Sequence, residues 1–504
     1  MPHRADFPAI EVTVFPAACR AYVVLLFVAM ATTATAASAD SRPSPAASLA
    51  PCTLPGVAHP ARCGSIEVPE NPDKPDGRQL SLNIVVLPAR NGHALPDPVA
   101  FLSGGPGQAA TSDPAHLSTI LAGINEERDL LLLDQRGTGK SAPLRCPLVD
   151  AADTAPNLRD IFPPAAIKRC IKALSATADL TQYSLRHFAR DLETVRVALG
   201  YESLNLYGFS YGTRAAQVYL RTYPKTSRTA YLGSMAPIDA DVLLEFPDAA
   251  EQTLVRTFDA CAADAACHAA FPALRQEFAT LLERLDSGSV VVTAAGTNTK
   301  VTLSRGRFAE RLRSMLYTPE SAVSVPWVLH QAHEGNWQPL ADGMLDFARS
   351  MDAQASMGLF FSITCNEDVA FLREADIRAR ATPRQFGDFR IRSQQAACAL
   401  WPRYRVPDGY RKPIQTDVPT MLVSAELDPA TPASLAARAA PGYTRHVEVL
   451  LRGQGHSGWT DCIGERYAQL LRQGTVEGIS RECPATPWPA FQLKAEEAPA
   501  DGKG

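Results

Sequence analysis

The sequence predicts a protein of the α/β class, in which a mostly parallel sheet is flanked by helices. Two observations predict this class. Between about residues 80 and 235, short apolar runs such as 130–133 and 204–207 alternate with helical patterns such as 190–199, and such alternation is typical of parallel sheets with helices on both faces. Strand patterns of this kind then stop and resume only near residue 419, so we expect a helical segment inserted into the sheet's order.

A glycine-flanked serine follows the strand predicted at 204–207. The segment Gly208-Phe209-Ser210-Tyr211-Gly212 joins that strand to a helix predicted at 213–222. A Gly-x-Ser-x-Gly turn between a strand and a helix is a nucleophile elbow. Its glycines avoid clashes with the flanking backbone, and the sharp turn lifts the serine hydroxyl clear of the sheet. We therefore interpret Ser210 as a nucleophile.

A serine hydroxyl needs a base to act as a nucleophile, and the base needs an acid to orient it. Downstream of Ser210 the chain offers an acid and then a histidine, each on a loop that follows a predicted strand. Asp428 is the acid that we favour, although it could instead cap the following helix, and Glu426 is a competitor two residues away. His456 lies on a glycine-flanked loop. We expect Ser210, Asp428 and His456 to form a catalytic triad.

Backbone N–H groups must also stabilise the charge that develops on the attacked carbonyl oxygen. Tyr211, directly after the serine, is expected to supply one of them. The glycine-rich segment 103–107, which follows an apolar strand, is expected to supply the second, from Gly105 or alternatively from Gly104. The other interpretation of this segment is an ordinary Gly/Pro turn.

These motifs resemble the prolyl iminopeptidase and tripeptidyl aminopeptidase group of α/β-hydrolases. The region from about 419 to 487 resembles the C-terminal region of the tripeptidyl aminopeptidase branch. One departure is Ser103, because many prolyl iminopeptidases begin this motif with histidine. The other segments that carry the resemblance are Ser103-Gly104-Gly105-Pro106-Gly107, Asp134-Gln135-Arg136-Gly137-Thr138-Gly139-Lys140-Ser141 and Gly208-Phe209-Ser210-Tyr211-Gly212-Thr213.

The resemblance implies an α/β-hydrolase fold with the triad and the oxyanion hole named above. It also implies that Asp134 and Arg136 are structural residues that hold the loop beneath the site. The implied activity is that of an aminopeptidase, which would form an acyl-enzyme on Ser210. A carboxylesterase or other small-ester hydrolase would need the same triad and is the alternative. A catalytically silent binding protein is a second alternative, against which the complete set of triad residues argues.

Helical patterns dominate between residues 236 and 412, and we expect a mainly helical cap there, inserted between nucleophile and acid. A cap excludes water and shapes the substrate pocket. An aminopeptidase must bind a free α-ammonium group, for which carboxylates are suited, and the resemblance implies acids of the cap. Glu367 is our first candidate for binding the ammonium group, and Asp368 is the second. The alternative interpretation of these two acids is that they mark the start of a surface helix. The helices predicted in the cap are 247–261, 270–285, 305–317, 320–334 and 338–350.

The N-terminus reads as a signal peptide, with arginines, an apolar stretch at 21–30 and a cleavage site after Ala39. The apolar stretch is shorter than the roughly 20 residues that span a bilayer, so we expect no membrane anchor and an exported protein, periplasmic or secreted. The predicted divisions are a signal peptide at 1–39, catalytic core at 40–235 and 413–490, the cap at 236–412 and a disordered tail at 491–504.

Cysteine usage agrees with export. Of 11 cysteines, removal of Cys19 with the signal peptide leaves 10, an even number. Buried free thiols are the alternative to disulfides. Our hypothesis pairs sequence neighbours, as Cys52–Cys63, Cys146–Cys170, Cys261–Cys267, Cys365–Cys398 and Cys462–Cys483.

The composition narrows the class of partner. The net charge is −4, and the sequence has no block of lysines and arginines. Both observations argue against nucleic acid as a partner. No His, Cys or carboxylate group has metal-ligand spacing, so we expect neither a metal nor an organic cofactor. The substrate expected is a peptide or a small ester.

Overall fold

The computed structural model describes residues 48–294, 297–456 and 459–494. The chain divides into two units, Met1–Pro43 and Ser44–Gly504. The first unit, which contains the predicted signal peptide, lies outside the described residues, as does most of the predicted tail. All helices and strands given below belong to the second unit.

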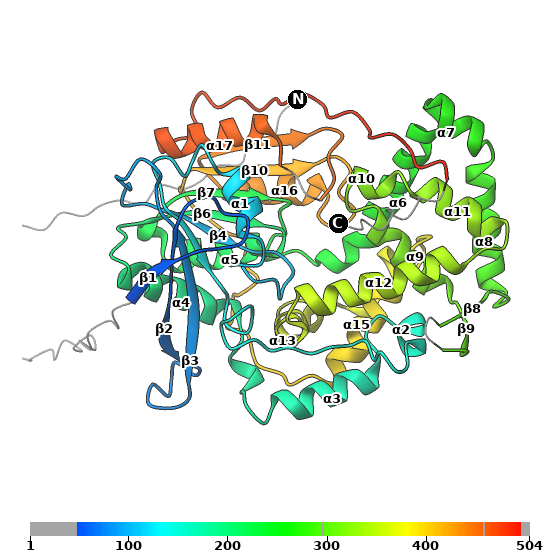
Figure 1. The fold of residues 1–504 in the computed structure, drawn as a ribbon, viewed down its shortest axis with the longest axis horizontal. Coiled ribbons are helices and arrows are strands. Elements are labelled where there is room, and N and C mark those ends of the chain that lie inside the picture. The colour runs from blue at the N-terminus through cyan, green and yellow to red at the C-terminus, as the bar shows by residue number, and fades with distance from the viewer. Residues whose placement is uncertain (1–47, 295–296, 457–458, 495–504) are drawn as a thin grey trace, which may run out of the picture. The chain divides into compact units, whose positions relative to one another are not determined.

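Nine strands of the described residues form one sheet, in the order β1-β2-β3-β5-β4-β6-β7-β10-β11 (Figure 1). From β5 onward all neighbouring strands are parallel, whereas β1, β2, β3 and β5 pair antiparallel. This mostly parallel sheet confirms the predicted fold class. The strands are β1 Ser48–Cys52, β2 Ala61–Pro69, β3 Gln79–Leu87, β4 Val99–Leu102, β5 Leu130–Leu133, β6 Leu204–Phe209, β7 Ser227–Gly233, β10 Thr420–Ala425 and β11 His446–Leu451.

Helices cover both faces of the sheet. Since successive side chains of a strand point to opposite sides, neighbouring residues of one strand pack against different helices. In β3, Ile84 belongs to the same buried cluster as residues of α4 (Leu185–Ala198) and α5 (Tyr211–Thr222). Its neighbour Val85 belongs to a second cluster, together with residues of α1 (Pro114–Ile120) and α17 (Asp461–Gln473). The central strands are therefore buried on both sides, which explains their continuous apolar character.

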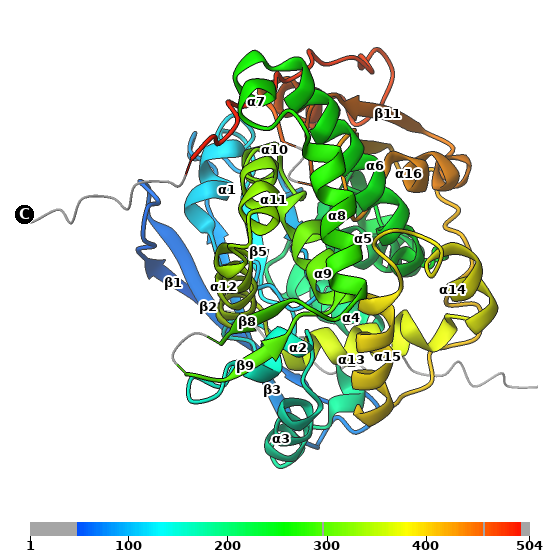
Figure 2. The same cartoon turned by 90° about the vertical axis from the view of Figure 1, so that its right-hand side faces the viewer.

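Among the described residues between Gly233 and Thr420, none belongs to a strand of this sheet, and most of the stretch is helical (Figure 2). We call residues 236–412 the helical insertion. It has a buried core of its own and one short hairpin, β8 Val291–Thr293 with β9 Lys300–Thr302. Its helices are α6 Val242–Ala263, α7 Ala265–Ala270, α8 Leu274–Asp286, α9 Arg305–Met315, α10 Pro319–Ala322, α11 Val325–His333, α12 Gln338–Gln354, α13 Met357–Glu367, α14 Glu374–Arg380 and α15 Phe389–Leu400.

Three further helices lie outside the insertion. They are α2 Ala155–Arg159 and α3 Pro164–Leu174, which precede α4, and α16 Ala433–Ala439, which lies between β10 and β11. Sequence patterns did not predict β1, β2 or β7.

Five disulfides join the described residues, and they are the five pairs predicted from the sequence. Their Cα–Cα distances lie between 5.0 and 5.8 Å. Cys365–Cys398 links α13 to α15 inside the helical insertion. Within the described parts of the chain, no helix combines the length and apolar character that crossing a membrane requires.

The close approach of α5 to β4 gives a testable prediction. A Cβ atom on Gly212 would lie 1.9 Å from the carbonyl oxygen of Leu102, and both atoms belong to packed backbone. Gly212→Ala should therefore lower the free energy of unfolding by at least about 2 kcal/mol, measured by chemical denaturation. Gly123→Ala is the matched control, because nothing lies within 4 Å of the added Cβ atom. Equal stability of the two variants would contradict this account of the elbow.

Candidate active site

Ser210 occupies the sharp turn between β6 and α5. Its φ of 53° places it in the left-handed region, which among the described non-glycine residues only Ala142 and Ser234 share. Such a conformation costs on the order of 1–3 kcal/mol and persists only where the surroundings enforce it. Here the Ser210 N–H donates to the carbonyl of Gly233 at 2.9 Å, and Thr213 N–H donates to the Ser210 carbonyl at 3.0 Å. The backbone thus holds the hydroxyl above the end of β6.

The structure brings Ser210, His456 and Asp428 into direct contact. The Nε2 atom of His456 lies 2.9 Å from the Ser210 Oγ, across 246 residues of sequence. Its Nδ1 atom lies 2.9 and 2.8 Å from the two carboxylate oxygens of Asp428. With the ring proton on Nδ1, the imidazole donates to the carboxylate and leaves Nε2 free to accept from the hydroxyl.

The carboxylate of Asp428 is buried and has four donors. Besides His456, it accepts the N–H groups of Ala430 at 2.9 Å and Thr431 at 2.7 Å, and the Thr431 hydroxyl at 2.8 Å. Burial raises the pKa of this carboxyl, but His456 and the hydrogen bonds outweigh burial and lower the pKa to about 2. Asp428 is therefore ionised at neutral pH.

Glu426, the competing acid, lies elsewhere. Its carboxylate binds Arg256 at 2.7 Å and accepts the N–H of Gly453 at 3.0 Å. The loop after β10 therefore presents Asp428, and not Glu426, to the imidazole of His456.

The helical insertion also supports His456. The His456 N–H donates to the carbonyl of Tyr317 at 2.6 Å, and the Tyr317 ring meets the imidazole edge to face at 5.1 Å between centroids. The ring of Phe209 lies 5.2 Å away. Sequence reasoning missed Tyr317, because a contact across more than 130 residues leaves no local pattern.

The glycine-rich segment 103–107 lies beside the serine. A Cβ atom on Gly104 would lie 3.5 Å from the Ser210 Cβ, and Gly105 has a φ of 109°, which suits glycine. The carbonyl of Gly107 accepts the N–H of Ser356 at 2.8 Å, so the segment is tied to the helical insertion just before α13. Gly105 and Tyr211, the predicted oxyanion-hole residues, both line the cavity onto which Ser210 opens.

The loop after β5 is held by its own charged residues. Asp134 accepts the N–H groups of Thr111 at 3.0 Å and Lys140 at 3.1 Å. Arg136 is fully buried and binds Asp191 through two hydrogen bonds of 2.7 Å. These contacts fit the structural role that the family resemblance implied for both residues.

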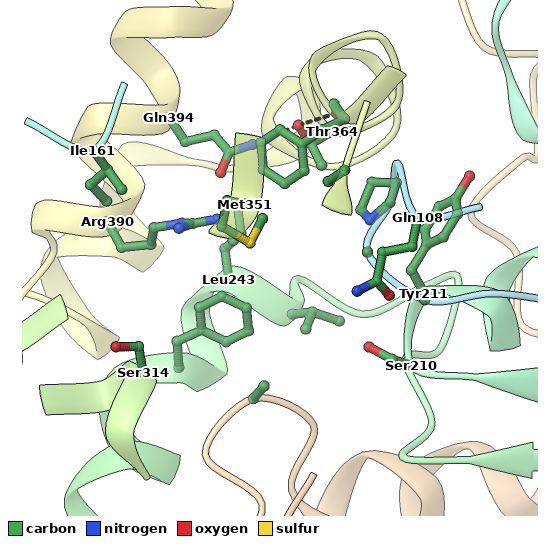
Figure 3. Close-up of a pocket in the computed structure, with 18 of the residues that line it drawn as sticks. Gln108, Ile161, Ser210, Tyr211, Leu243, Ser314, Met351, Thr364, Arg390 and Gln394 are labelled. Atoms are coloured by element: carbon green, nitrogen blue, oxygen red, sulfur yellow. Dashed lines mark hydrogen bonds between the residues drawn. The ribbon is translucent and has the colours of Figure 1, made fainter. Parts of the chain in front are cut away.

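A cavity of about 440 Å³ opens at Ser210, between the catalytic residues and the helical insertion. In Figure 3, Ser210, Tyr211 and Gln108 lie on one side of it and Arg390 and Ile161 on the other. A cavity of this size and largely apolar lining is typical of a site for a small ligand. Its apolar lining includes Phe209, Leu243, Phe246, Met351, Met357 and Phe360.

Glu367, the first choice for binding an ammonium group, does not line this cavity. It is the last residue of α13, whose residues are all buried, so the alternative of a surface helix start is wrong. Its carboxylate accepts the N–H of Leu185 at 3.0 Å and the hydroxyls of Tyr404, at 2.6 Å, and Tyr410. Burial raises the pKa of Glu367, and these hydrogen bonds oppose the rise.

Asp368, the second choice, does line the cavity. Its carboxylate pairs with Arg214, another lining residue, and its side chain is 16% exposed. Sequence reasoning missed Arg214, which sits on the buried side of α5. Among the described residues, no three His, Cys, Asp or Glu side chains gather in a way that could hold a metal ion.

Known proteins resemble this chain over most of its length. The family model for TAP-like proteins matches residues 382–483. The serine protease Hip1 of Mycobacterium tuberculosis is 26% identical over 478 residues, covering 84% of this chain and 87% of that protein. The tripeptidyl aminopeptidase of Streptomyces lividans is 29% identical over 216 residues, covering 37% and 39% of the two chains. Together with the mostly parallel sheet, these similarities support a TAP-like serine hydrolase of the α/β-hydrolase fold.

The TAP-like match contains Asp428 and His456, whereas Ser210 lies outside it. A shorter similarity, 38% identity over 92 residues, links this chain to Carboxylesterase B of M. tuberculosis and covers 17% of each chain. The two relatives with longer matches are both named as peptidases. These findings support a serine peptidase or hydrolase.

The buried carboxylate of Asp428 predicts a pH-dependent stability. Because its pKa in the folded protein, about 2, is below the value of about 4 expected when unfolded, its contribution is complete above pH 4 and is lost as the pH falls through 2. The wild type should therefore lose about 2 kcal/mol of unfolding free energy relative to Asp428→Asn between pH 5 and pH 2. Denaturant titrations of both proteins across this range measure the difference. A constant difference would contradict the depressed pKa.

Proposed function

We propose that this TAP-like hydrolase is an exported aminopeptidase that releases N-terminal residues through a triad of Ser210, His456 and Asp428. The observation that carries the proposal is the imidazole of His456, which lies within hydrogen-bond distance of both the Ser210 hydroxyl and the Asp428 carboxylate. This is the geometry that a serine nucleophile with a general base requires.

In the proposed reaction, His456 Nε2 takes the proton of Ser210 as the Oγ attacks the substrate carbonyl carbon. The N–H groups of Tyr211 and Gly105 would stabilise the resulting oxyanion. The imidazolium then gives its proton to the leaving amine, and the C–N bond breaks to leave an acyl-enzyme. Nε2 then takes a proton from a water molecule as the water oxygen attacks the acyl carbon. The imidazolium returns this proton to the Ser210 Oγ as the ester bond breaks and the acid leaves. Asp428 keeps the Nδ1 proton in place and stabilises the imidazolium.

For the substrate's α-ammonium group we favour Asp368 over Glu367. Asp368 lines the cavity at Ser210, whereas Glu367 does not, and its carboxylate already has three donors. The names of the relatives support a peptide substrate. Asp368 is paired with Arg214, so an ammonium group would join an existing ion pair and share its carboxylate.

Export is supported by the disulfides. Five of them join the described residues, and disulfides are rare in reducing compartments. The signal-peptide pattern at residues 1–39 agrees with this. We propose a periplasmic or secreted location.

The aminopeptidase proposal predicts a preference for free N-termini. Peptidyl arylamides of one to three residues should be hydrolysed about tenfold or more faster, in kcat/KM, with a free amine than when N-acetylated. Asp368→Asn should reduce this ratio, which does not depend on how much of the variant is folded. Asp259→Asn is the matched control, since Asp259 lies exposed in an ion pair with Arg275 and should leave the ratio unchanged. A ratio of one in the wild type would contradict an ammonium site.

The local similarity to Carboxylesterase B keeps an ester hydrolase as the second candidate. Short acyl esters separate the two functions. Turnover of acyl esters without turnover of free-amine arylamides would assign the site to ester hydrolysis. Both activities should require Ser210, so Ser210→Ala should lose on the order of 10⁴-fold or more in kcat in either case.

A further inference from the structure

Three arginines of the helical insertion line the same cavity. Arg307 and Arg313 come from α9 and Arg390 comes from α15, and all three border the space onto which Ser210 opens. Arg307 and Arg313 are 2% and 4% exposed, and the side chain of Arg390 is 18% exposed. Such burial is unusual for guanidinium groups, which are rarely removed from water unless they are paired.

One carboxylate, that of Glu310, is hydrogen-bonded to two of these three cations. Glu310 accepts from Arg313 at 3.0 and 2.7 Å, and its Oε1 also accepts from Arg390 at 3.0 Å. The Nε of Arg307 donates instead to the backbone carbonyl of Asn157 at 3.0 Å, and no carboxylate of the described residues forms a hydrogen bond or ion pair with this cation. The group therefore carries an excess of positive charge in a buried place.

Donor groups of this cluster are left unused. The Nε of Arg390 is buried without a hydrogen-bond partner among the described residues. Its guanidinium lies over the rings of Phe162, at 5.0 Å, and Phe360, at 5.9 Å, which fix its direction. Figure 3 shows Arg390 reaching into the cavity from the side opposite Ser210. Burial lowers the pKa of Arg307 to about 10, so it stays charged at neutral pH.

The other acids of the cavity are engaged elsewhere. Asp352 accepts the N–H groups of Leu148 and Val149, both at 2.8 Å. Asp368 pairs with Arg214, whereas the cluster's own carboxylate partner is Glu310. Neither carboxylate makes a hydrogen bond or ion pair with Arg307, Arg313 or Arg390 in the described structure.

We propose that this arginine cluster binds a carboxylate of the substrate, supplied by an Asp or Glu side chain in the N-terminal part that the enzyme releases. The inference rests on the proposed function, which places that part of the peptide in the cavity. Guanidinium groups recognise carboxylates through two parallel hydrogen bonds, and the free donors of Arg390 and Arg307 provide them. The negative charge would also offset the excess positive charge that the cavity now buries.

The test uses tripeptide amides titrated by calorimetry into the Ser210→Ala protein, which binds peptides without cleaving them. Each peptide carries Glu or its neutral isostere Gln at the first, second or third position, and the amide removes the terminal carboxylate. At one of the three positions, the dissociation constant of the Glu peptide should be lower than that of the Gln peptide by about tenfold or more. Adding Arg390→Gln should bring this ratio close to one.

Two further variants control the result. Arg390→Lys keeps the charge and should retain part of the preference. Arg275→Gln removes an exposed arginine of the helical insertion and should leave the ratio unchanged. Gln peptides that bind as tightly as Glu peptides at all three positions, or a preference that survives Arg390→Gln, would overturn the proposal.

Glutarate separates this proposal from the proposed function. If no peptide binds, the aminopeptidase proposal fails, and glutarate titrated against the neutral glutaramide then decides whether the cluster is an anion site. Binding of glutarate alone that is lost in Arg390→Gln would keep the anion site and reject the peptide. Equal behaviour of glutarate and glutaramide would reject the anion site as well.

Discussion

The hydrogen bonds of the His456 imidazole are the interaction on which the rest of the site depends. The ring meets Ser210 through one nitrogen and Asp428 through the other, and these three residues follow β11, β6 and β10. Because these strands are parallel, their carboxyl ends lie at the same edge of the sheet. The apolar burial that holds the strands in register therefore also fixes the spacing of the three functional side chains.

The helical insertion takes part in this arrangement. Tyr317, just after α9, fixes the backbone of His456, and Ser356 fixes Gly107 in the glycine-rich segment. Both contacts are backbone hydrogen bonds between the insertion and loops at the sheet's edge. The insertion thus positions the histidine loop and the glycine loop and, in addition, forms the wall of the cavity. Arg390 of α15 lies at the end of the cavity opposite Ser210 (Figure 3), and two arginines of α9 also line the cavity.

Much of this arrangement could be predicted from the sequence, because its signals are local. The elbow at Ser210 needs glycine at positions 208 and 212, since a Cβ atom there would collide with backbone. The five disulfides join cysteines that are neighbours in sequence order. Contacts between distant segments could not be predicted. The burial of Glu367 depends on Tyr404, Tyr410 and the backbone of Leu185, and nothing near Glu367 in the sequence indicates these partners. Arg307 of α9 likewise donates to the carbonyl of Asn157, a contact across 150 residues that the sequence around Arg307 does not indicate.

The central claim is that Ser210 is a nucleophile activated by His456, and locating a covalent adduct tests it most directly. The purified protein is treated with a fluorophosphonate, digested and mapped by mass spectrometry, alongside His456→Ala. The account predicts one modified peptide, with the adduct on Ser210, and a labelling rate that falls by orders of magnitude in the histidine variant. An adduct on another residue, or labelling of Ser210 at the same rate without the imidazole, would contradict it.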